Sequence, residues 1–345
     1  MSKRIVVGIS GGVDSTLTAL RLKEAGYEVT AVHLVMKDSI DPRDSARMEA
    51  LERQENISVR HIDCRERFVQ KVIQPFLNAY SSGQTPNPCV ICNEAVKVRC
   101  LIEEADRLGI AQVATGHYAG TMQTEHGHAI VRASSKKDQS YMLYRLPSEW
   151  IGRLVFPLRS DEKHDVRQET AQRLHSDQFS LGDSQDICFL GDQNLEDYLR
   201  SHLSAESIKP GLITDTEGNA LGTHRGVSLY TEGQRKGLGL SGGPWFVRSK
   251  DRAENRLVLE HGKETGVHRI SFCCANWQQP VSTGTTYSVQ YRYRCVPVTG
   301  NLIRYDGSSG EFELSLPAGG VAAGQSLVFY DGTMLLGGGI ITSAQ

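Results

Sequence analysis

Short apolar runs alternate with amphipathic segments over the first half of the chain. Apolar and β-branched residues gather in segments expected to be buried strands, at 4–9, 29–34, 58–62 and 112–115. Apolar residues recur at helical spacing between them, which predicts helices at 13–26, 44–54, 68–76 and 96–105. The first of these should end at Gly26, a residue typical of helix C-caps. Strands that alternate with helices predict a parallel α/β sheet.

The pattern changes after about residue 205. Glycine becomes dense, helical spacing fades, and the apolar segments become short, which predicts an all-β carboxy-terminal part. The strand-like segments are 212–214, 227–230, 256–259, 286–293, 312–316 and 327–330. We therefore expect an amino-terminal α/β domain over 1–205, a central β-rich domain over 206–265 and a β-barrel over 266–345.

Composition and charge narrow the classes of function. Hydrophobic residues make up 39% and charged residues 23%, the balance of a globular protein. Because the net charge is −2, a polyanion would have to be met by local basic pairs. The candidate pairs are Lys97/Arg99, Lys136/Lys137, Arg235/Lys236 and Arg292/Arg294. No apolar run reaches the ~18–20 residues of a membrane helix, and eight cysteines without an export signal favour the reducing cytoplasm.

The segment 10–15, Ser-Gly-Gly-Val-Asp-Ser, lies between the first strand and the first helix. Two glycines let backbone N–H groups converge, and the helix N-terminus adds positive potential, which suits a phosphate or pyrophosphate. Ser10 and Ser15 can donate hydroxyls, and Asp14 can hold Mg²⁺ on the phosphates. A Walker A lysine and a GxGxxG pattern are both missing, which disfavours a P-loop NTPase and a dinucleotide fold. A plain strand–helix turn capped by Ser or Asp is the alternative.

Cys89 and Cys92 lie in the segment 85–93, TPNPCVICN. The prolines fix the backbone, Asn93 can cap a following helix, and a thiol at a helix N-terminus has a lowered pKa. A C-x2-C pair also occurs in zinc and iron–sulfur sites. Zinc would need further ligands, for which the candidates are Cys100 and His117. Cys188 lies among apolar residues, a setting typical of an inert buried cysteine.

Together these segments resemble one family, the bacterial tRNA-specific 2-thiouridylases of the PP-loop (N-type) ATP pyrophosphatase superfamily. The matching motifs are SGGVDS (10–15), TPNPCVICN (85–93), ATGHYA (114–119), KDQSYMLY (137–144), SQDICFLG (184–191), GQRKGLGL (233–240), YRYR (291–294), GQSLVFYDG (324–332) and LGGG (336–339). SGGVDS alone identifies only the superfamily, whereas an ordered set along nearly the whole chain is specific to the family.

The resemblance implies an architecture and an activity. The architecture is a Rossmann-like PP-loop domain, a small central β domain and a carboxy-terminal β-barrel that contacts tRNA. The activity is that of an ATP-dependent sulfurtransferase, which adenylates the C2 oxygen of the wobble uridine in tRNA and replaces it with sulfur. The implied cofactors are ATP and Mg²⁺. The implied partners are tRNA and an upstream protein that donates persulfide sulfur, with no membrane involved.

Site residues carry over by position. The ATP-binding positions are Gly8, Ile9, Ser10, Gly11, Gly12, Val13, Asp14, Ser15, Leu34 and Gly116, where relatives often have methionine in place of Leu34. The family's nucleophile matches Cys92 and its persulfide-bearing cysteine matches Cys188; these two form a transient disulfide, and Asp14 is also counted as catalytic. The positions around the target base and the tRNA are Asn87, Pro88, Cys89, His117, Lys137, Asp138, Gln139, Arg292, Tyr293 and Gln325.

One departure from the family bears on the mechanism. Many relatives have aspartate where this chain has Cys89. Cys89, Cys92 and Cys188 could therefore hold a [4Fe–4S] cluster with one open iron, in place of persulfide chemistry. We favour the persulfide route.

Other classes of protein stay open at this point. Another adenylating PP-loop enzyme, a 4-thiouridine synthase or an amidotransferase-type synthetase, is the nearest alternative. A zinc-dependent RNA-binding module without catalysis is the other. The paired-cysteine loop disfavours the synthetase, and the all-β carboxy-terminal half disfavours the 4-thiouridine synthase.

Overall fold

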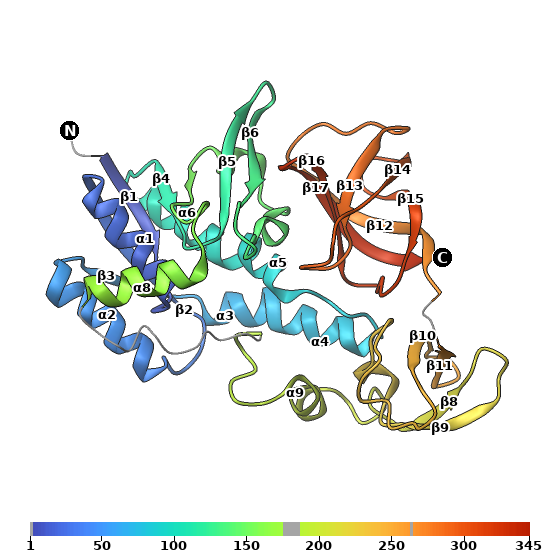
Figure 1. The fold of residues 1–345 in the computed structure, drawn as a ribbon. Coiled ribbons are helices and arrows are strands. Elements are labelled where there is room, and N and C mark those ends of the chain that lie inside the picture. Colours follow the sequence, from blue (N-terminus) through green and yellow to red (C-terminus); the bar gives the residue numbers. More distant parts are fainter. Residues whose placement is uncertain (1–2, 175–186, 263–264) are drawn as a thin grey trace.

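The amino-terminal part of the molecule is built on a five-stranded parallel sheet with the order β3-β2-β1-β4-β7 (Figure 1). The structure is a computed structural model that describes residues 3–174, 187–262 and 265–345. The strands are β1 (Lys3–Gly8), β2 (Tyr27–Val35), β3 (Val59–Asp63), β4 (Gln112–Ala114) and β7 (Leu154–Val155). The predicted α/β class with a parallel sheet is confirmed.

Helices cover both faces of this sheet. The helices of the described residues are α1 (Val13–Glu24), α2 (Pro42–Glu55), α3 (Arg65–Phe68), α4 (Gln74–Ser81), α5 (Pro88–Cys92), α6 (Val98–Arg107), α7 (Ser148–Ile151), α8 (Lys163–Arg173) and α9 (Leu195–His202), of which α9 packs against α4 rather than on the sheet. Successive residues of a strand point to opposite faces. Ile5 and Val7 of β1 therefore pack with α1 and α2, while Val6 packs with α6. Burial on both faces explains why β1 is a continuous apolar run.

Two helical rods contain π-helical segments. Val69–Ile73 joins α3 to α4, and Asn93–Lys97 joins α5 to α6. The second rod begins at Pro88, eight residues before the predicted helix at 96–105. Cys89 and Cys92 therefore lie inside the first turns of a long helical rod rather than in a loop before it.

The central part is a four-stranded sheet with the order β10-β11-β8-β9. Its strands are β8 (Gly211–Thr214), β9 (Ala220–His224), β10 (Trp245–Asp251) and β11 (Arg256–His261). The strand predicted at 227–230 is wrong, because Val227–Leu229 forms a 3₁₀ turn. Gly226, at φ +130°, redirects the chain so that Val227 enters the core of this sheet.

The carboxy-terminal part is a closed barrel of six strands, in which β12 pairs with both β15 and β17. The strands are β12 (Val267–Trp277), β13 (Thr286–Gln290), β14 (Val298–Tyr305), β15 (Gly310–Ala318), β16 (Ser326–Asp331) and β17 (Met334–Ala344). The strand predicted at 286–293 ends at Gln290, because the Gln290 side chain donates to the Cys295 carbonyl and Arg294 has a positive φ. The YRYR segment is therefore a turn at the end of a strand.

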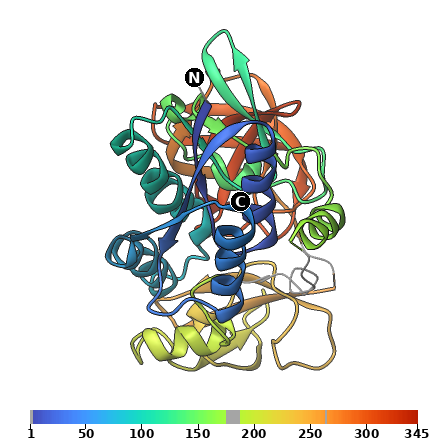
Figure 2. The ribbon, with the colours of Figure 1, turned by 90° about the vertical axis from the view of Figure 1, so that its left-hand side faces the viewer.

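The barrel is joined to the amino-terminal part. The hairpin β5 (Ala119–Thr124) and β6 (Gly127–Arg132) continues the barrel sheet through β17. Tyr141 donates its buried hydroxyl to the Ser326 carbonyl at 3.0 Å, and the Ser326 hydroxyl donates to that of Tyr144 at 3.1 Å. In the view turned by 90°, the barrel lies behind the amino-terminal sheet, with the central sheet below (Figure 2).

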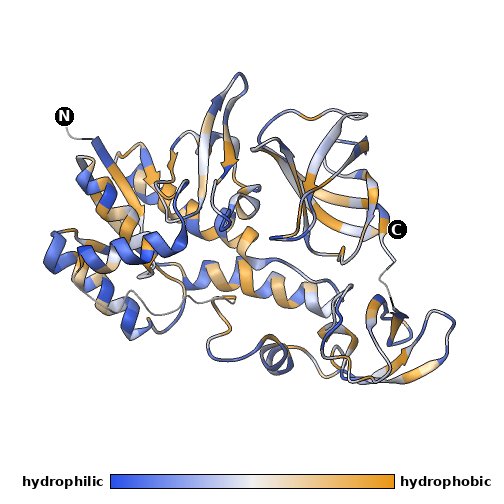
Figure 3. Cartoon of the chain, in the orientation of Figure 1, coloured by the Kyte–Doolittle hydropathy of each residue, from blue (hydrophilic) through white to orange (hydrophobic). Residues whose placement is uncertain are grey.

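Hydropathy follows this arrangement. The outer turns of α2 and α8 are hydrophilic, whereas the strands of the parallel sheet and of the barrel carry many apolar residues (Figure 3). Among the described residues, no helix is long and apolar enough to cross a membrane. The domain limits expected at 205 and 265 stay a prediction.

Candidate active site

The site lies where the strand order of the parallel sheet reverses. From β1 the chain moves outward to β2 and then β3, while β4 and β7 lie on the other side of β1. In open α/β sheets, ligands bind at the carboxyl ends of the strands at this switch point. Residues 9–12 follow β1 there, and Thr115 and Gly116 follow β4.

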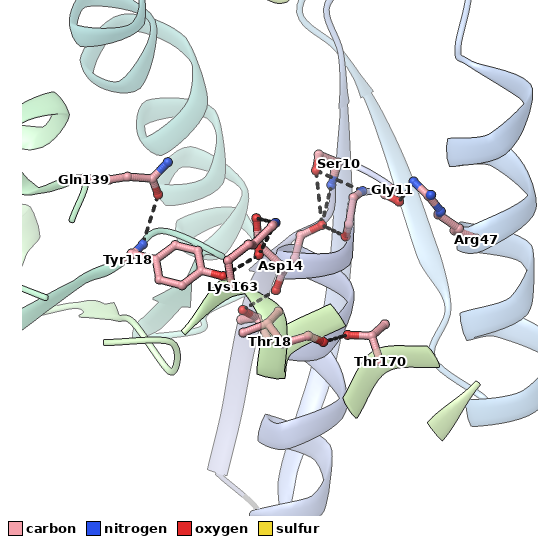
Figure 4. Close-up of polar contacts among 12 residues, drawn as sticks. Ser10, Gly11, Asp14, Thr18, Arg47, Tyr118, Gln139, Lys163 and Thr170 are labelled. Carbon is pink, nitrogen blue, oxygen red and sulfur yellow. Dashed lines mark hydrogen bonds and ion pairs between the residues drawn. The ribbon is translucent and has the colours of Figure 1, made fainter. Parts of the chain in front are cut away.

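The loop 10–15 is held by its own hydroxyl groups. The Ser10 amide donates to Ser15 Oγ at 3.1 Å, Ser15 Oγ donates to the Gly12 carbonyl at 3.0 Å, and the Gly12 amide donates to Ser10 Oγ (Figure 4). Gly12 is the N-cap of α1 and has no side chain to bond the first amides of the helix. These amides of a twelve-residue helix are therefore free to bind an anion. Phosphate binding by this loop stays a prediction.

Two glycines of the site are required by close approach. Gly11 has φ +82°, and a Cβ there would lie 2.4 Å from the Asp44 Cβ. Gly116, also predicted at the ATP site, packs on the start of α1, where its Cβ would lie 2.8 Å from the Ser15 amide nitrogen. Larger residues at either position would push the loop out of place. Leu34, another position predicted to bind ATP, lies near the end of β2, and its side chain is buried in the core.

Asp14 forms the centre of a polar cluster. Lys163, the first residue of α8, donates to both carboxylate oxygens of Asp14 at 2.7 and 2.6 Å, and the Tyr118 hydroxyl donates at 2.8 Å (Figure 4). Sequence reasoning missed both Lys163 and Tyr118. Tyr118 lies inside the ATGHYA motif and could have been found there. Lys163 lies 149 residues from Asp14 in no recognised motif, so no sequence signal pointed to it.

Several predicted tRNA positions lie beside this cluster and hold the site together. Gln139 Oε1 accepts from the Tyr118 amide at 3.0 Å, linking the KDQ motif to the Asp14 cluster (Figure 4). The Asp138 carboxylate accepts from the Ala133 amide and the Ser140 hydroxyl, so it is occupied within its own loop. Lys137 is half-buried.

The cysteine loop, residues 85–93, is held by hydrogen bonds at both ends. The Thr85 amide donates to the Ala323 carbonyl at 2.8 Å, and Gln325 Nε2 donates to the Thr85 carbonyl at 2.7 Å. Asn87 caps α5 by accepting from the Cys89 amide, and Pro88 is the first residue of that helix. The cap predicted at Asn93 is wrong: Asn93 lies inside the rod, buried, and its amide donates to the Met142 carbonyl.

The thiols of Cys89 and Cys92 do not have the lowered pKa that the sequence predicts. Burial raises the pKa of Cys92 to about 12 and also raises the pKa of Cys89, although the Lys97 ammonium acts in the opposite direction on both. The effect of the helix N-terminus is outweighed because Cys92 is only 4% exposed. The expectation of an available thiolate is therefore wrong for the protein without its ligands.

Cys188 is exposed, which corrects the expectation of an inert buried cysteine. The next residue, Phe189, packs edge-on against Phe68 and Phe76, with ring centroids 5.9 and 5.1 Å away. Lys37 donates to the Cys188 carbonyl at 2.7 Å. The apolar neighbours thus anchor the backbone and leave the thiol free. Cys188 lies close enough to Cys89 and Cys92 for its charge to act on their pKa. Residues 184–186 of its motif lie outside the described residues.

The cysteines do not form a metal-binding set in the part of the chain that the structure describes. No group there of three or more His, Cys, Asp or Glu side chains is placed to hold a metal ion. The [4Fe–4S] cluster expected as an alternative at Cys89, Cys92 and Cys188 is therefore not shown, and the choice between the two sulfur routes stays a prediction. The zinc alternative with Cys100 or His117 lacks support for the same reason. His117 instead contacts Thr115, with 2.8 Å between its Nδ1 and the hydroxyl oxygen.

The barrel contributes an exposed basic turn. Arg292 and Arg294 are exposed, and the Arg294 guanidinium lies 4.9 Å from the centre of the Tyr293 ring. Tyr293 is half-buried, with its ring centroid 5.9 Å from that of Tyr141, and burial raises its pKa. Tyr293 packs against the core cluster that includes Val90 and Cys92, so the turn lies against the core that holds the cysteine loop.

Comparisons with known proteins agree along the whole chain. Three family models match: a tRNA methyl transferase HUP domain (residues 3–192), a tRNA methyl transferase PRC-barrel domain (196–261) and an aminomethyltransferase β-barrel domain (263–341). A tRNA-specific 2-thiouridylase of Chloroflexus aurantiacus is 40% identical over 98% of each chain. One of Syntrophotalea carbinolica is 37% identical over 99% of each chain. A solved 4-thiouridine synthetase in complex with RNA and ATP covers 59% of this chain and 51% of its own, at 11% identity and a TM-score of 0.36.

Proposed function

The chain belongs to the family of tRNA-specific 2-thiouridylases, and we propose that its site divides the reaction between an adenylating half around Asp14 and a sulfur-transfer half around Cys92 and Cys188. It is a tRNA-uridine 2-sulfurtransferase, which uses ATP to replace the C2 oxygen of the wobble uridine with sulfur. The observation that supports the division is that α1 begins without a side-chain cap after the loop 10–15, while Cys188 is exposed and its charge would act on the pKa of Cys92.

The adenylating half would bind ATP at the switch point of the sheet. The free amides of α1 would hold the phosphates, with Gly8, Ile9 and the loop 10–15 on one side and Gly116 and Leu34 beside the adenosine. Mg²⁺ is commonly held by one or two carboxylates together with substrate phosphates, so Asp14 fits that role. Lys163 would then leave Asp14 for the triphosphate. The C2 oxygen of uridine is a poor leaving group. Attack of this oxygen on the α-phosphorus of ATP would release pyrophosphate and attach AMP to the oxygen, which makes it a good leaving group.

The sulfur-transfer half would use the two thiols in sequence. A donor protein would leave a persulfide on the exposed Cys188 thiol. The Cys92 thiolate would attack Cys188 Sγ, forming the Cys92–Cys188 disulfide and breaking the bond to the terminal sulfur, which leaves as hydrosulfide. Hydrosulfide would attack C2 and displace AMP. The sulfane sulfur gains the two electrons that the two cysteines lose, and a cytoplasmic dithiol reductant would restore the thiols.

The tRNA would lie across the cysteine loop and the barrel turn. Arg292, which is exposed, and the half-buried Lys137 would contact phosphates, and Tyr293 would stack on an unstacked base. Asn87, Pro88, Cys89 and His117 would surround the target base. Asp138, Gln139 and Gln325 are engaged in internal hydrogen bonds, so their role would be to shape the surface that the tRNA meets.

Nucleoside analysis tests this function. The protein is given unmodified tRNA, ATP, Mg²⁺ and a persulfide donor; AMP is quantified, and the digested tRNA is examined by mass spectrometry. We expect 2-thiouridine in the parental protein, none in Cys92→Ala or Cys188→Ala, and parental levels in Cys295→Ala as the matched control. 4-Thiouridine or a methylated nucleoside in its place would overturn the proposal. Anaerobic preparation with iron and sulfide quantified decides between the persulfide and cluster routes.

A further inference from the structure

The π-helical segment Asn93–Lys97 determines which residues share the side of Cys92. In an α-helix, a residue five positions later points about 140° away. A π-helix closes its hydrogen bonds from i to i+5, and the Val98 amide here donates to the Asn93 carbonyl in that pattern. Lys97, five residues after Cys92, therefore lies closer to the side of Cys92 than an α-helix would place it. The π-helical segment thus brings a lysine toward the side of the rod that carries the thiol.

The charge of Lys97 acts on thiols. Burial alone would lower the pKa of Lys97, yet its pKa is raised, because Cys92, Cys188 and Cys89 together outweigh that cost. In the described residues no carboxylate lies within ion-pair distance of it, whereas its neighbour Arg99 bonds Glu94 at 3.4 Å and lies over Trp150. The phosphate contact expected of the pair Lys97/Arg99 stays a prediction.

The other titratable group that faces Lys97 is neutral. Burial, and then the Lys97 ammonium, lower the pKa of His117 to about 3. The groups coupled to Lys97 by charge are Cys89 and Cys92 of its own rod, Cys188 of the segment before α9, and His117, which follows β4. Around neutral pH, Lys97 is therefore the single cation among the described groups that act on these thiols.

We propose that Lys97 is a positioning residue of the sulfur-transfer step, where its ammonium supplies the counter-charge for the Cys92 thiolate that attacks the Cys188 persulfide. This inference rests on the proposed function and deepens it. The Cys92 proton is lost to solvent before the attack, and Lys97 stays protonated throughout. The negative charge then passes from Cys92 to the departing hydrosulfide. A fixed cation beside both stabilises the charge along this path without reorganisation.

The test uses thiol reactivity together with turnover. Lys97→Met is compared with Lys97→Arg, which keeps the charge, and with Lys71→Met, a matched change of an exposed lysine in the other π-helical segment. Alkylation of Cys92 by iodoacetamide is followed from pH 7 to 10, with tandem mass spectrometry separating it from Cys89. AMP release, tRNA affinity and 2-thiouridine formation are measured on the same proteins.

Lys97→Met should lower the rate of Cys92 alkylation at pH 8 at least tenfold, move its pH profile upward, and lower 2-thiouridine formation by a similar factor. AMP release and tRNA affinity should stay parental, Lys97→Arg should restore most of the rate, and Lys71→Met should match the parent. If Lys97→Met does not fold, Lys97→Gln provides the same comparison. An unchanged alkylation profile overturns the proposal, as does a loss of tRNA affinity, which would assign Lys97 to a phosphate. If the parent makes no 2-thiouridine, the proposed function fails, while the alkylation profile still decides the role of Lys97.

Discussion

The ion pair between Asp14 and Lys163 can be tested as a unit, because it joins α1 to α8 as well as serving the phosphate site. Asp14→Asn keeps the shape of the side chain and removes its charge. Lys163→Met keeps most of the length of its partner and also removes the charge. The double variant removes both, so the three proteins and the parent form a thermodynamic cycle.

The structure sets the size of the expected effect. The Lys163 side chain is 11% exposed and that of Asp14 is 32% exposed. Breaking a fully buried pair costs about 3–5 kcal/mol, whereas a fully exposed pair contributes about 0–1 kcal/mol. Because water reaches Asp14 from one side, we expect each single variant to cost about 1–2 kcal/mol. The double variant should cost less than the sum, with a coupling of about 1 kcal/mol.

Hydrogen exchange measures this cost locally. Exchange of the amides in α1 and α8 gives the free energy of local opening, which avoids treating a three-part chain as a single two-state unit. Asp165→Asn, an exposed change two positions along α8, is the control; it should show no coupling to Lys163, since residues two apart on a helix do not face each other. A coupling below about 0.3 kcal/mol would refute the reasoning. In the same proteins, Asp14→Asn should lower tRNA-dependent AMP formation at least about a hundredfold, since metal and phosphate stabilisation is worth several kcal/mol.

Four further predictions concern the thiols, the barrel turn and the contact between domains. Burial raises the pKa of Cys92 to about 12, so the contribution of the buried, protonated thiol to stability is complete below the pKa of about 8.5 in the unfolded chain and is lost as pH rises toward 12. Urea unfolding at stepped pH should therefore show a smaller loss of stability at alkaline pH in Cys92→Ala than in the parent. Cys89→Asp should keep 2-thiouridine formation near the parental level when it is assayed without oxygen. A variant that loses both its activity and its bound iron would favour the cluster route. Arg292→Ala should weaken tRNA binding and reduce its salt dependence by about one unit of slope without changing ATP affinity; equal titrations for both proteins would contradict this. Tyr141→Phe should destabilise the contact between the barrel and the amino-terminal part by about 1–3 kcal/mol, because the Ser326 amide and carbonyl both lose a buried partner; unchanged hydrogen exchange in β16 would count against it.

Local patterns in the sequence determine much of this protein. The alternation of apolar runs and amphipathic segments is a property of neighbouring residues, and it predicts the parallel sheet and its helices. The glycines of the loop 10–15 permit the tight turn, and Ser10 and Ser15 within the same six residues hold it, so this turn is predicted from neighbouring residues. The prolines and Asn87 likewise place the cysteine loop at the start of a helix, although the cap was expected at Asn93.

Tertiary structure decides what depends on distant parts of the chain. Lys163 reaches Asp14 only because the strand order brings α8 beside α1, and no local pattern records a contact across 149 residues. The pKa of Cys92 follows from how deeply the rod is buried, which reverses the effect expected from its helix position. The strand expected at 227–230 is replaced by a turn because Gly226 directs Val227 into the core of the central sheet, whereas the strand expected at 286–293 ends early through a nearby bond from Gln290 to the Cys295 carbonyl. Propensity and spacing report on a few neighbouring residues, whereas burial and charge depend on everything packed around a group, and only the folded chain defines that environment.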